Sequence, residues 1–246
     1  MKALILAAGV GSRLRPLTDS TPKALIPVGG VPMLERAALR LRAAGADSFV
    51  VNAHAHAQAV ADFCPGLARR LGVPVSVSRE DDLLLDTGGA IRKAAPLLRG
   101  KKPFFVHNAD VVTDVDLKEL YAAHEKSGAL ATLSVRERET SRAYLFDPKG
   151  RFIGHDDRTT GRVTWIKGPV PGFQRLPFDG LHVISPALLD KITETGVFSI
   201  TKTYLRLAAA GADIRAFRGD RWAWHDAGSP EKLAAAEAWL AGASKN

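Results

Sequence analysis

The chain opens with the stretch KALILAAGVGSRLRPLTDSTPKAL, residues 2–25. Its apolar start, Lys2–Ala7, is typical of a buried strand, and a loop rich in glycine and proline follows at Ala8–Pro32. Glycines at the end of a parallel strand let backbone N–H groups approach phosphate oxygens, and open α/β sheets bind ligands at this edge. Arg13 offers two donors to a phosphate, and Lys23 adds a point charge. The stretch therefore predicts an α/β fold with a phosphate-binding loop.

Two common phosphate-binding patterns do not match this loop. The P-loop pattern Gly-x-x-x-x-Gly-Lys-Ser/Thr is absent. The dinucleotide fingerprint needs a third glycine where the chain has Leu14, and an acid at the end of the second strand, where it has Asn52. A nicotinamide-dependent oxidoreductase is therefore disfavoured.

The first half of the chain alternates strands and helices. Strands are expected at Lys2–Ala7, Ser48–Asn52, Pro74–Ser78, Pro103–His107 and Ala129–Val135. Helices are expected at Met33–Ala44, Ala57–Leu71 with a break at Pro65-Gly66, Thr87–Leu98 and Asp116–Ser127, with Asp116 as N-cap. This alternation favours a doubly wound, mostly parallel sheet.

The second half has a different pattern. Ala143–Asp147 and Arg151–Gly154 flank a Pro-Lys-Gly turn and predict a hairpin, whereas Arg162–Leu176 shows no clear period. Phe178–Ile184 and Asp213–Arg218 are expected to be strands. No linker separates two domains, so we expect one domain over residues 1–246, with an alternating half at 1–135 and a differently patterned part at 136–246.

Composition narrows the class of partner. The net charge is +8, from 34 Lys+Arg and 26 Asp+Glu, but the basic residues are scattered along the chain. We therefore expect small phosphorylated ligands and no nucleic acid. Apolar runs are too short for a membrane span or a signal peptide, and the single cysteine, Cys64, cannot form an internal disulfide. We expect a cytoplasmic monomer or homodimer without a membrane partner.

A longer pattern runs through the opening stretch. Leu6-Ala7-Ala8-Gly9-x-Gly11-x-Arg13, followed by Pro16-Leu17-Thr18, Pro22-Lys23 and Pro27-Val28, resembles the signature of the sugar-1-phosphate nucleotidyltransferases. The resemblance covers almost the whole chain and implies the nucleotide-diphospho-sugar transferase fold, a Rossmann-like sheet with an added β-rich portion that binds the sugar. It implies that residues 1–135 are the nucleotide-binding half and that residues 136–246 are the sugar-binding and C-terminal part. It implies that the loop binds the nucleotide through Ala7, Ala8, Gly9, Gly11 and Ser12, and that Arg13 and Lys23 are catalytic.

Two carboxylates are candidate ligands of Mg²⁺, the cofactor that the resemblance implies. Asp110 ends the segment His107–Asp110, after the fourth strand, where a carboxylate would face the same crevice as the loop. Asp226 lies in Trp224–Glu231, which resembles the family's Trp-x-Asp-Val-Gly-Thr-Pro-Glu. Taken alone, either acid could instead stabilise the start of a helix. The resemblance also implies that Asn108 contacts the nucleotide.

A further segment, Asp86–Ala90, contains the Thr-Gly-Gly sequence that reads the nucleobase in the family. Alone it would be a plain strand-to-helix turn; the resemblance implies that Thr87 and Gly88 bind the nucleotide. Glu80, just after the third strand, matches another nucleotide contact of the family.

The sugar side is less well marked. Asp179–His182 resembles a family segment whose glycine lies near the sugar, which implies a role for Gly180, whereas His182 could equally be packed in the core. Many relatives hold the sugar phosphate with the lysine of a Glu-Lys-Pro stretch, which this chain lacks. Lys167 is the nearest basic candidate, although its context does not match, and Asn52 is a further candidate at the end of the second strand.

The resemblance predicts an enzyme that joins an NTP to a sugar 1-phosphate and releases pyrophosphate. The overall pattern is similar to that of uridylyltransferases acting on N-acetylmuramate 1-phosphate and of guanylyltransferases acting on mannose or heptose 1-phosphate, so UTP or GTP is the expected nucleotide. A phosphocholine cytidylyltransferase and a non-catalytic NDP-sugar sensor remain alternatives.

Overall fold

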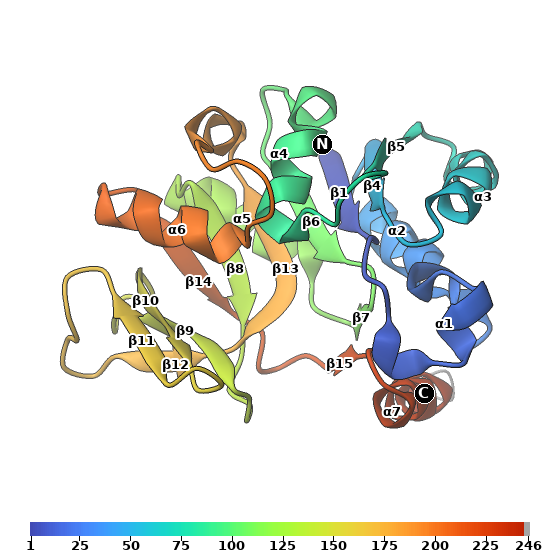
Figure 1. Cartoon of the computed structure of the whole chain (residues 1–246). Coiled ribbons are helices and arrows are strands. Elements are labelled where there is room, and N and C mark those ends of the chain that lie inside the picture. The colour runs from blue at the N-terminus through green and yellow to red at the C-terminus, as the bar shows by residue number, and fades with distance from the viewer. Residues whose placement is uncertain (244–246) are drawn as a thin grey trace.

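A seven-stranded sheet forms the centre of the computed structural model, which describes residues 1–243 (Figure 1). The strand order is β14-β8-β13-β6-β1-β4-β5, and only β13 runs antiparallel to its neighbours. The strands are β1 (Lys2–Leu6), β4 (Ser48–Ala53), β5 (Val75–Arg79), β6 (Phe104–Asn108), β8 (Ala131–Val135), β13 (Phe178–Ile184) and β14 (Ile214–Arg218). The predicted mostly parallel sheet is confirmed.

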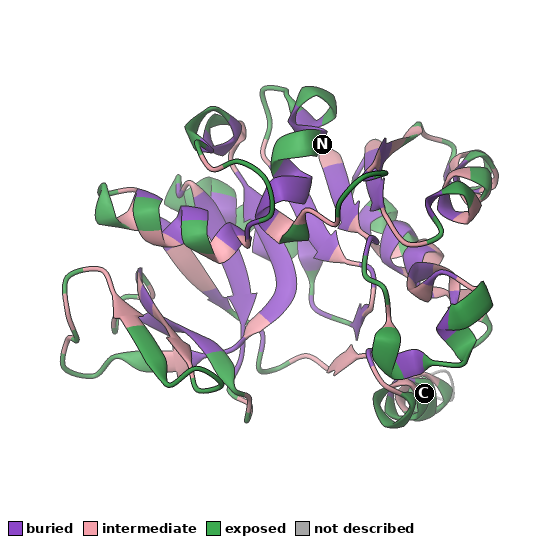
Figure 2. Ribbon diagram, in the orientation of Figure 1, coloured by how far each residue is buried: buried purple, intermediate pink, exposed green. Residues whose placement is uncertain are grey.

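Helices cover both faces of this sheet, as the alternation of β1 requires. Ala3 and Ile5 pack in the same buried cluster as α2, α3 and α5, whereas Leu4 packs with α4 and α6. These helices are α2 (Met33–Ala43), α3 (Ala57–Leu71), α4 (Asp86–Leu98), α5 (Leu117–Ser127) and α6 (Ile200–Ala209). Figure 2 shows the sheet buried between helices whose outer faces are exposed. The doubly wound arrangement is thus confirmed.

The predicted break at Pro65-Gly66 is wrong, because α3 continues without interruption to Leu71. Proline removes one helical hydrogen bond and disfavours the helix interior. Here Val60, Cys64 and Leu67 are buried against the sheet on both sides of the proline. Burial of this apolar face keeps the helix intact. By contrast, the predicted N-cap Asp116 does accept hydrogen bonds from the amides of Lys118 and Glu119, at 2.9 and 3.0 Å.

A separate four-stranded antiparallel sheet carries the β-rich part of the second half (Figure 1). Its order is β11-β10-β9-β12, and the predicted hairpin is its β9–β10 pair. The strands are β9 (Arg142–Phe146), β10 (Phe152–Asp157), β11 (Arg162–Trp165) and β12 (Gln174–Leu176). The two strands between residues 162 and 176 were not predicted, because that segment lacks a strand period.

Short elements assemble the edge of the sheet where β1 and β6 end. The opening loop contains the 3-10 helices η1 (Ser12–Leu14) and η2 (Lys23–Leu25), the helix α1 (Leu17–Ser20) and the strand pair β2 (Pro27–Val28) and β3 (Val31–Pro32). Two further short strands, β7 (Val111–Thr113) and β15 (Trp224–Asp226), pair antiparallel, and α7 (Pro230–Ala243) follows β15. Within residues 1–243, no helix combines the length and apolar character that a membrane crossing requires.

Candidate active site at the carboxyl edge of the sheet

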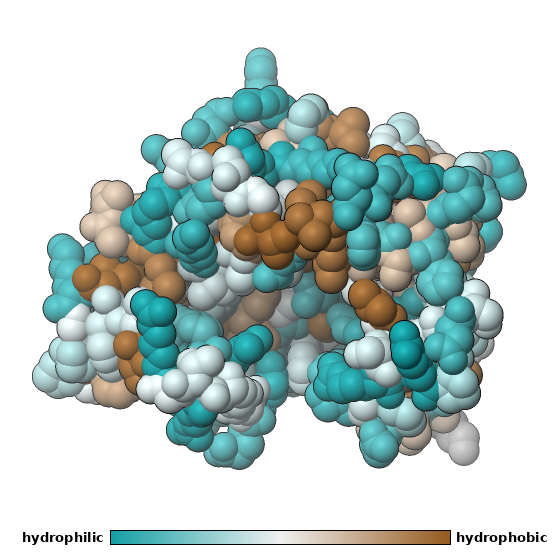
Figure 3. Space-filling view, viewed as in Figure 1, coloured by the Kyte–Doolittle hydropathy of each residue, from teal (hydrophilic) through white to brown (hydrophobic). Residues whose placement is uncertain are grey.

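A cleft with a volume of about 440 Å³ lies at this edge. That volume is in the range of small-molecule sites. Figure 3 shows the same face of the molecule hollowed near its centre. The lining residues are Leu6, Ala7, Ala8, Gly9, Lys23, Ala24, Asn52, Glu80, Leu84, Asp86, Thr87, Ala90, Asn108, Ala109, Asp110 and Val197. Most of the residues predicted to bind a nucleotide therefore line this cleft, although they come from both faces of the sheet and follow several different strands.

The opening loop folds back on itself around Gly11. This glycine has a φ of +68°, and its carbonyl accepts hydrogen bonds from the amide of Leu14 at 2.8 Å and the hydroxyl of Thr18 at 2.9 Å. A Cβ atom at Gly11 would lie 2.8 Å from Thr18 Cγ2 and 3.0 Å from Lys23 Cβ. The tight turn therefore requires glycine, and it sets Lys23 against the loop. The loop's other predicted ligands, Ser12 and Arg13, are exposed to solvent.

Both predicted metal carboxylates carry a lysine partner in this structure. Lys23 Nζ forms an ion pair with Asp110, and Lys232 Nζ lies 2.5 Å from Asp226 Oδ2. Asp226 Oδ1 also accepts a hydrogen bond from the amide of Gly228 at 2.8 Å. The two acids thus lie in cationic surroundings that would also suit the phosphates of a nucleotide.

The pairing of β7 with β15 places these two acids at one site. Asp226 lies opposite Val111 in the ladder, and Val111 is the residue that directly follows Asp110. A Cβ atom on Gly228 would lie 2.5 Å from Asp226 Oδ1 and 2.8 Å from Arg13 Nη2, so Arg13 reaches the same place from the opening loop. The four predicted charged groups, Arg13, Lys23, Asp110 and Asp226, therefore converge.

The electrostatics of Asp226 reflect this convergence. Burial raises the pKa of its carboxyl group, but the hydrogen bond and charge of Lys232 and the charge of Lys23 outweigh burial, so the pKa lies below its ordinary value. Asp226 is therefore ionised near neutral pH and is able to ligate a cation.

The donor set fits Mg²⁺ in one particular way. Within residues 1–243, no group of three or more His, Cys, Asp or Glu side chains could hold a metal on its own. Asp110 and Asp226 supply two carboxylates, and each of them already forms an ion pair with the ammonium group of a lysine. Mg²⁺ commonly uses one or two carboxylates and takes its other ligands from water and substrate phosphates. The site suits a metal that arrives with a nucleotide.

A buried hydrogen-bond chain supports the wall opposite the charged groups. Asn52 Oδ1 accepts from the amide of Ala7 at 2.6 Å, and Asn52 Nδ2 donates to Glu80 Oε1 at 2.8 Å. Glu80 Oε2 accepts from the amide of Leu85 at 2.9 Å. Asn52 and Glu80 are only 3% and 1% exposed. These side chains join the opening loop to the segment before α4, and their predicted ligand contacts stay predictions.

The Thr-Gly-Gly segment, which was expected to bind the nucleotide, uses its glycine amides for contacts within the protein. The amides of Gly88 and Gly89 both donate to the carbonyl of Phe198, at 2.9 and 3.2 Å. A Cβ atom at Gly88 would collide with the Phe198 ring. The glycines therefore allow the segment before α6 to pack closely against the start of α4, where Val197 lines the cleft. Thr87 lines the cleft, while its hydroxyl accepts from the amide of Ile200 at 3.0 Å.

The predicted sugar-side residues fall in different places. Gly180 has a φ of +78°, and a Cβ atom there would lie 2.8 Å from Asn108 Nδ2, so Gly180 packs against a residue of the cleft wall without lining the cleft itself. His182 is buried and its Nδ1 lies 2.6 Å from the hydroxyl of Tyr204, which identifies it as a packed residue. Lys167 is exposed just after β11 and is not among the residues that line the cleft.

Sequence reasoning missed several residues of the site. Leu84 and Val197 form apolar parts of its wall, and Lys232 is the ion-pair partner of Asp226. No periodic pattern marks the first two, because they lie in loops that reach the cleft through the Leu85–Phe198 backbone contact. Lys232 lies in the first turn of α7, six positions after Asp226, and is recognisable only once β15 is placed.

The fold and the site together define an α/β protein with a glycine-rich loop and a pair of carboxylates at the carboxyl edge of its sheet. A family model described as nucleotidyl transferase matches residues 2–146, and the chain belongs to this family of sugar-1-phosphate nucleotidyltransferases.

Individual relatives and structures agree with this assignment. N-acetylmuramate alpha-1-phosphate uridylyltransferase of Neisseria meningitidis is 35% identical over the full length of both chains. Mannose-1-phosphate guanylyltransferase 1 of Arabidopsis thaliana is 32% identical over 85% of this chain, which spans 57% of that relative's length. A solved UDP-glucose pyrophosphorylase in complex with UDP-glucose superimposes with a TM-score of 0.78 at 19% identity, covering 98% of both chains, and so supports the fold.

Proposed function

We propose that this chain transfers a nucleoside monophosphate from an NTP to a sugar 1-phosphate, forming an NDP-sugar and pyrophosphate. The convergence of Arg13, Lys23, Asp110 and Asp226 at one end of a ligand-sized cleft carries this proposal. Such an arrangement suits a reaction between two phosphorylated substrates, because it offers cations to both and a carboxylate pair for a bound metal.

The proposed reaction is an in-line displacement at the α-phosphorus of the NTP. A phosphate oxygen of the sugar 1-phosphate forms the new P–O bond, and the bond from the α-phosphorus to the bridging oxygen breaks, so that pyrophosphate leaves with the electron pair. The attacking phosphate is already ionised near pH 7, since phosphate monoesters have a second pKa near ~6. No general base is needed, and catalysis rests on positioning and charge stabilisation.

Each charged residue has a distinct part in this scheme. Arg13 and the loop around Gly11 would hold the β- and γ-phosphates, which matches their solvent-facing position. Lys23 lines the cleft and would stabilise charge at the α-phosphate. Asp110 and Asp226 would hold Mg²⁺, which would neutralise phosphate charge during transfer.

The first candidate substrates are UTP and an amino-sugar 1-phosphate such as N-acetylmuramate 1-phosphate. The observation that favours them is the Neisseria relative, a uridylyltransferase that this chain matches from end to end. GTP with mannose or heptose 1-phosphate is the second candidate, favoured by guanylyltransferases of Arabidopsis thaliana and Yarrowia lipolytica at 32% and 30% identity. This chain spans only 57% and 61% of those two proteins.

Pyrophosphate release tests the proposal. The purified chain is incubated with Mg²⁺, each common NTP and a panel of sugar 1-phosphates, with phosphocholine as the non-sugar acceptor. We expect release that needs both an NTP and a sugar 1-phosphate, with UTP and an amino-sugar 1-phosphate as the best pair. Release that occurs with an NTP and phosphocholine, but with no sugar 1-phosphate, would indicate a cytidylyltransferase. Nucleotide binding without release would indicate a sensor.

A further inference from the structure

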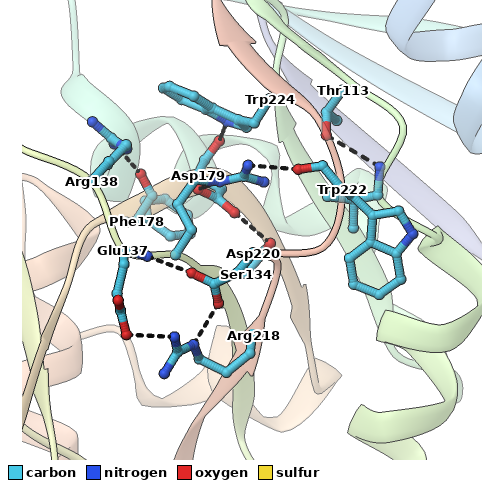
Figure 4. A network of polar contacts seen from close by, with 12 residues as sticks. Thr113, Ser134, Glu137, Arg138, Phe178, Asp179, Arg218, Asp220, Trp222 and Trp224 are labelled. Atoms are coloured by element: carbon cyan, nitrogen blue, oxygen red, sulfur yellow. Dashed lines mark hydrogen bonds and ion pairs between the residues drawn. The ribbon is translucent and has the colours of Figure 1, made fainter.

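Arg138, three residues after the end of β8, is a cation without a matching acid among the residues that the structure describes. Its Nη2 donates to the carbonyl of Phe178 at 2.9 Å, and its guanidinium carbon lies 4.4 Å from the centre of the Trp224 ring (Figure 4). A guanidinium has five N–H donors, and this is the one hydrogen bond that the described residues provide. The Nε atom is buried without any partner. Trp224 and the backbone thus hold the group in place while most of its donors stay free.

The neighbouring Arg136 shows what a structural arginine looks like in this region. Its Nε donates to Asp179 Oδ1 at 2.8 Å, and its Nη1 donates to the carbonyl of Trp222 at 2.9 Å. The Asp179 carboxylate is fully buried and also accepts from Ser134. Arg136 also has a buried nitrogen without a hydrogen-bond partner among the described residues, Nη2, but Asp179 neutralises its charge. By contrast, no carboxylate lies within ion-pair distance of Arg138 among residues 1–243.

Arg138 nevertheless lies in the electrostatic field of the active site. Burial lowers its pKa, and the charges of Asp179 and Asp226 act in the opposite direction. A half-buried guanidinium without a bonded anion is unfavourable in free energy, so an anionic ligand would stabilise it.

Two contacts link Arg138 to the cleft. Trp224 lies two positions before Asp226 on β15, and alternate residues of a strand point to the same side. Trp224 Nε1 also donates to the carbonyl of Asp179 at 2.8 Å, and the next residue, Gly180, abuts Asn108 in the cleft wall. Arg138 is not among the residues that line the cleft, but through Trp224 and the Asp179–Gly180 backbone it lies next to the site on the side of Asp226.

We propose that Arg138 binds the phosphate of the acceptor, the sugar 1-phosphate, and so supplies the cation that the absent Glu-Lys-Pro stretch would have provided. This proposal rests on the proposed function. A guanidinium suits the role because its planar fork binds phosphate through two parallel hydrogen bonds. In this assignment Arg13 and Lys23 serve the nucleotide, Arg138 serves the acceptor, and Lys167 has no part.

Steady-state kinetics on Arg138→Gln tests the assignment. With the best pair from the substrate panel, we expect the KM for the sugar 1-phosphate to rise about 10- to 100-fold, the range for a lost hydrogen bond to a charged group. The KM for the NTP should change less than about threefold, which also shows that the variant is folded. Arg138→Lys should give an intermediate KM. Arg142→Gln, which removes an exposed arginine of β9 that is paired with Asp157 of β10, should behave as wild type.

An unchanged KM for the sugar 1-phosphate in Arg138→Gln, or an equal rise in both KM values, would overturn the assignment. Failure of the wild type to turn over any pair would instead contradict the proposed function. In that case calorimetric titration with inorganic phosphate still measures the site. Phosphate binding at least tenfold weaker in Arg138→Gln than in Arg142→Gln supports an anion site, and equal affinities reject it.

Discussion

The amide of Ala227 donates a hydrogen bond to the carbonyl of Asp110 at 2.9 Å. This bond extends the β7–β15 ladder and fixes the backbone of Asp226 beside the end of β6. The two acids are distant in sequence. Asp110 directly precedes β7 and Asp226 is the last residue of β15, and these two short strands pair with each other. The spacing of the carboxylates is therefore set by backbone pairing, and substituting either side chain should leave this geometry intact.

Asp110→Asn and Asp226→Asn should each lower kcat by ~10²–10³-fold, the usual cost of removing one preorganised charged group from an active site. The double variant should lose less than the product of the two single effects, because the residues act as one unit. Asp114→Asn is the matched control, since Asp114 is exposed next to β7. A variant of Asp110 or Asp226 that kept near-normal kcat would contradict their assignment as metal ligands.

Gly11→Ala should abolish most activity through steric conflict as well as backbone strain. The new Cβ would lie 2.8 Å from Thr18 Cγ2, at a φ of +68°. Gly30→Ala separates the two effects, because Gly30 has a φ of +77° but no heavy atom within 4 Å of the place that a Cβ would take. Each variant should lose roughly 1–2 kcal/mol of stability in urea unfolding. Only Gly11→Ala should lose kcat/KM for the NTP; equal losses of activity would show that strain alone matters.

Asn52→Ala should destabilise the fold more than an average surface substitution. It removes both bonds of a buried side chain and leaves the Ala7 amide and the Glu80 carboxylate without those partners. Unsatisfied buried groups cost ~1–3 kcal/mol each, so a loss of roughly 2–5 kcal/mol in the free energy of unfolding is expected. Urea denaturation measures this loss. A loss below about 1 kcal/mol would mean that water replaces the amide and that the chain of hydrogen bonds is not a structural support.

Acidification should weaken the fold through buried neutral histidines. Burial lowers the pKa of His182 to about 3 and of His124 to about 4. The unfolded chain titrates these groups near ~6.5, so it binds more protons below that pH. Their contribution to stability is complete above pH ~6.5 and is lost as the pH falls toward the folded-state values. For His182 alone we expect a loss of about 2 kcal/mol between pH 7 and pH 5.

The measurement for this effect is urea unfolding of the wild type and His182→Gln at both pH values. The variant should show a smaller loss on acidification than the wild type, even if it is less stable overall. Thr195→Ala, at an exposed residue without a titratable side chain, is the control and should keep the wild-type pH dependence. An identical loss in all three proteins would show that other groups govern the acid sensitivity.

The sequence was most informative where local chemistry decides the structure. The buried strand β1, the glycine-rich loop after it and the N-cap Asp116 were predictable because each depends on neighbouring residues. The break at Pro65 was wrong because tertiary burial of one helix face overrides local propensity. The motifs therefore predicted the opening loop, but they did not predict how α3 packs against the sheet.

Long-range geometry accounts for what was missed. Strands β7 and β15 have three residues each, too few to show a period, yet their pairing assembles the carboxylate site. Lys232 and Arg138 belong to no pattern in the chain, and their relation to Asp226 depends on that pairing. In the same way, the occupation of the Gly88 amide by Phe198 could not be read from the Thr-Gly-Gly sequence alone.

The most direct test of the central claim is to follow a labelled phosphorus from UTP. The chain is incubated with Mg²⁺, an amino-sugar 1-phosphate and UTP labelled with ³²P in either the α or the γ position, and the products are separated by chromatography. We predict that α label appears in a UDP-sugar and γ label in pyrophosphate, in equal amounts and only when both substrates are present. Label from UTP that appears in UMP, and label from GTP with mannose 1-phosphate that appears in GMP, without any NDP-sugar in either case, would contradict nucleotidyl transfer.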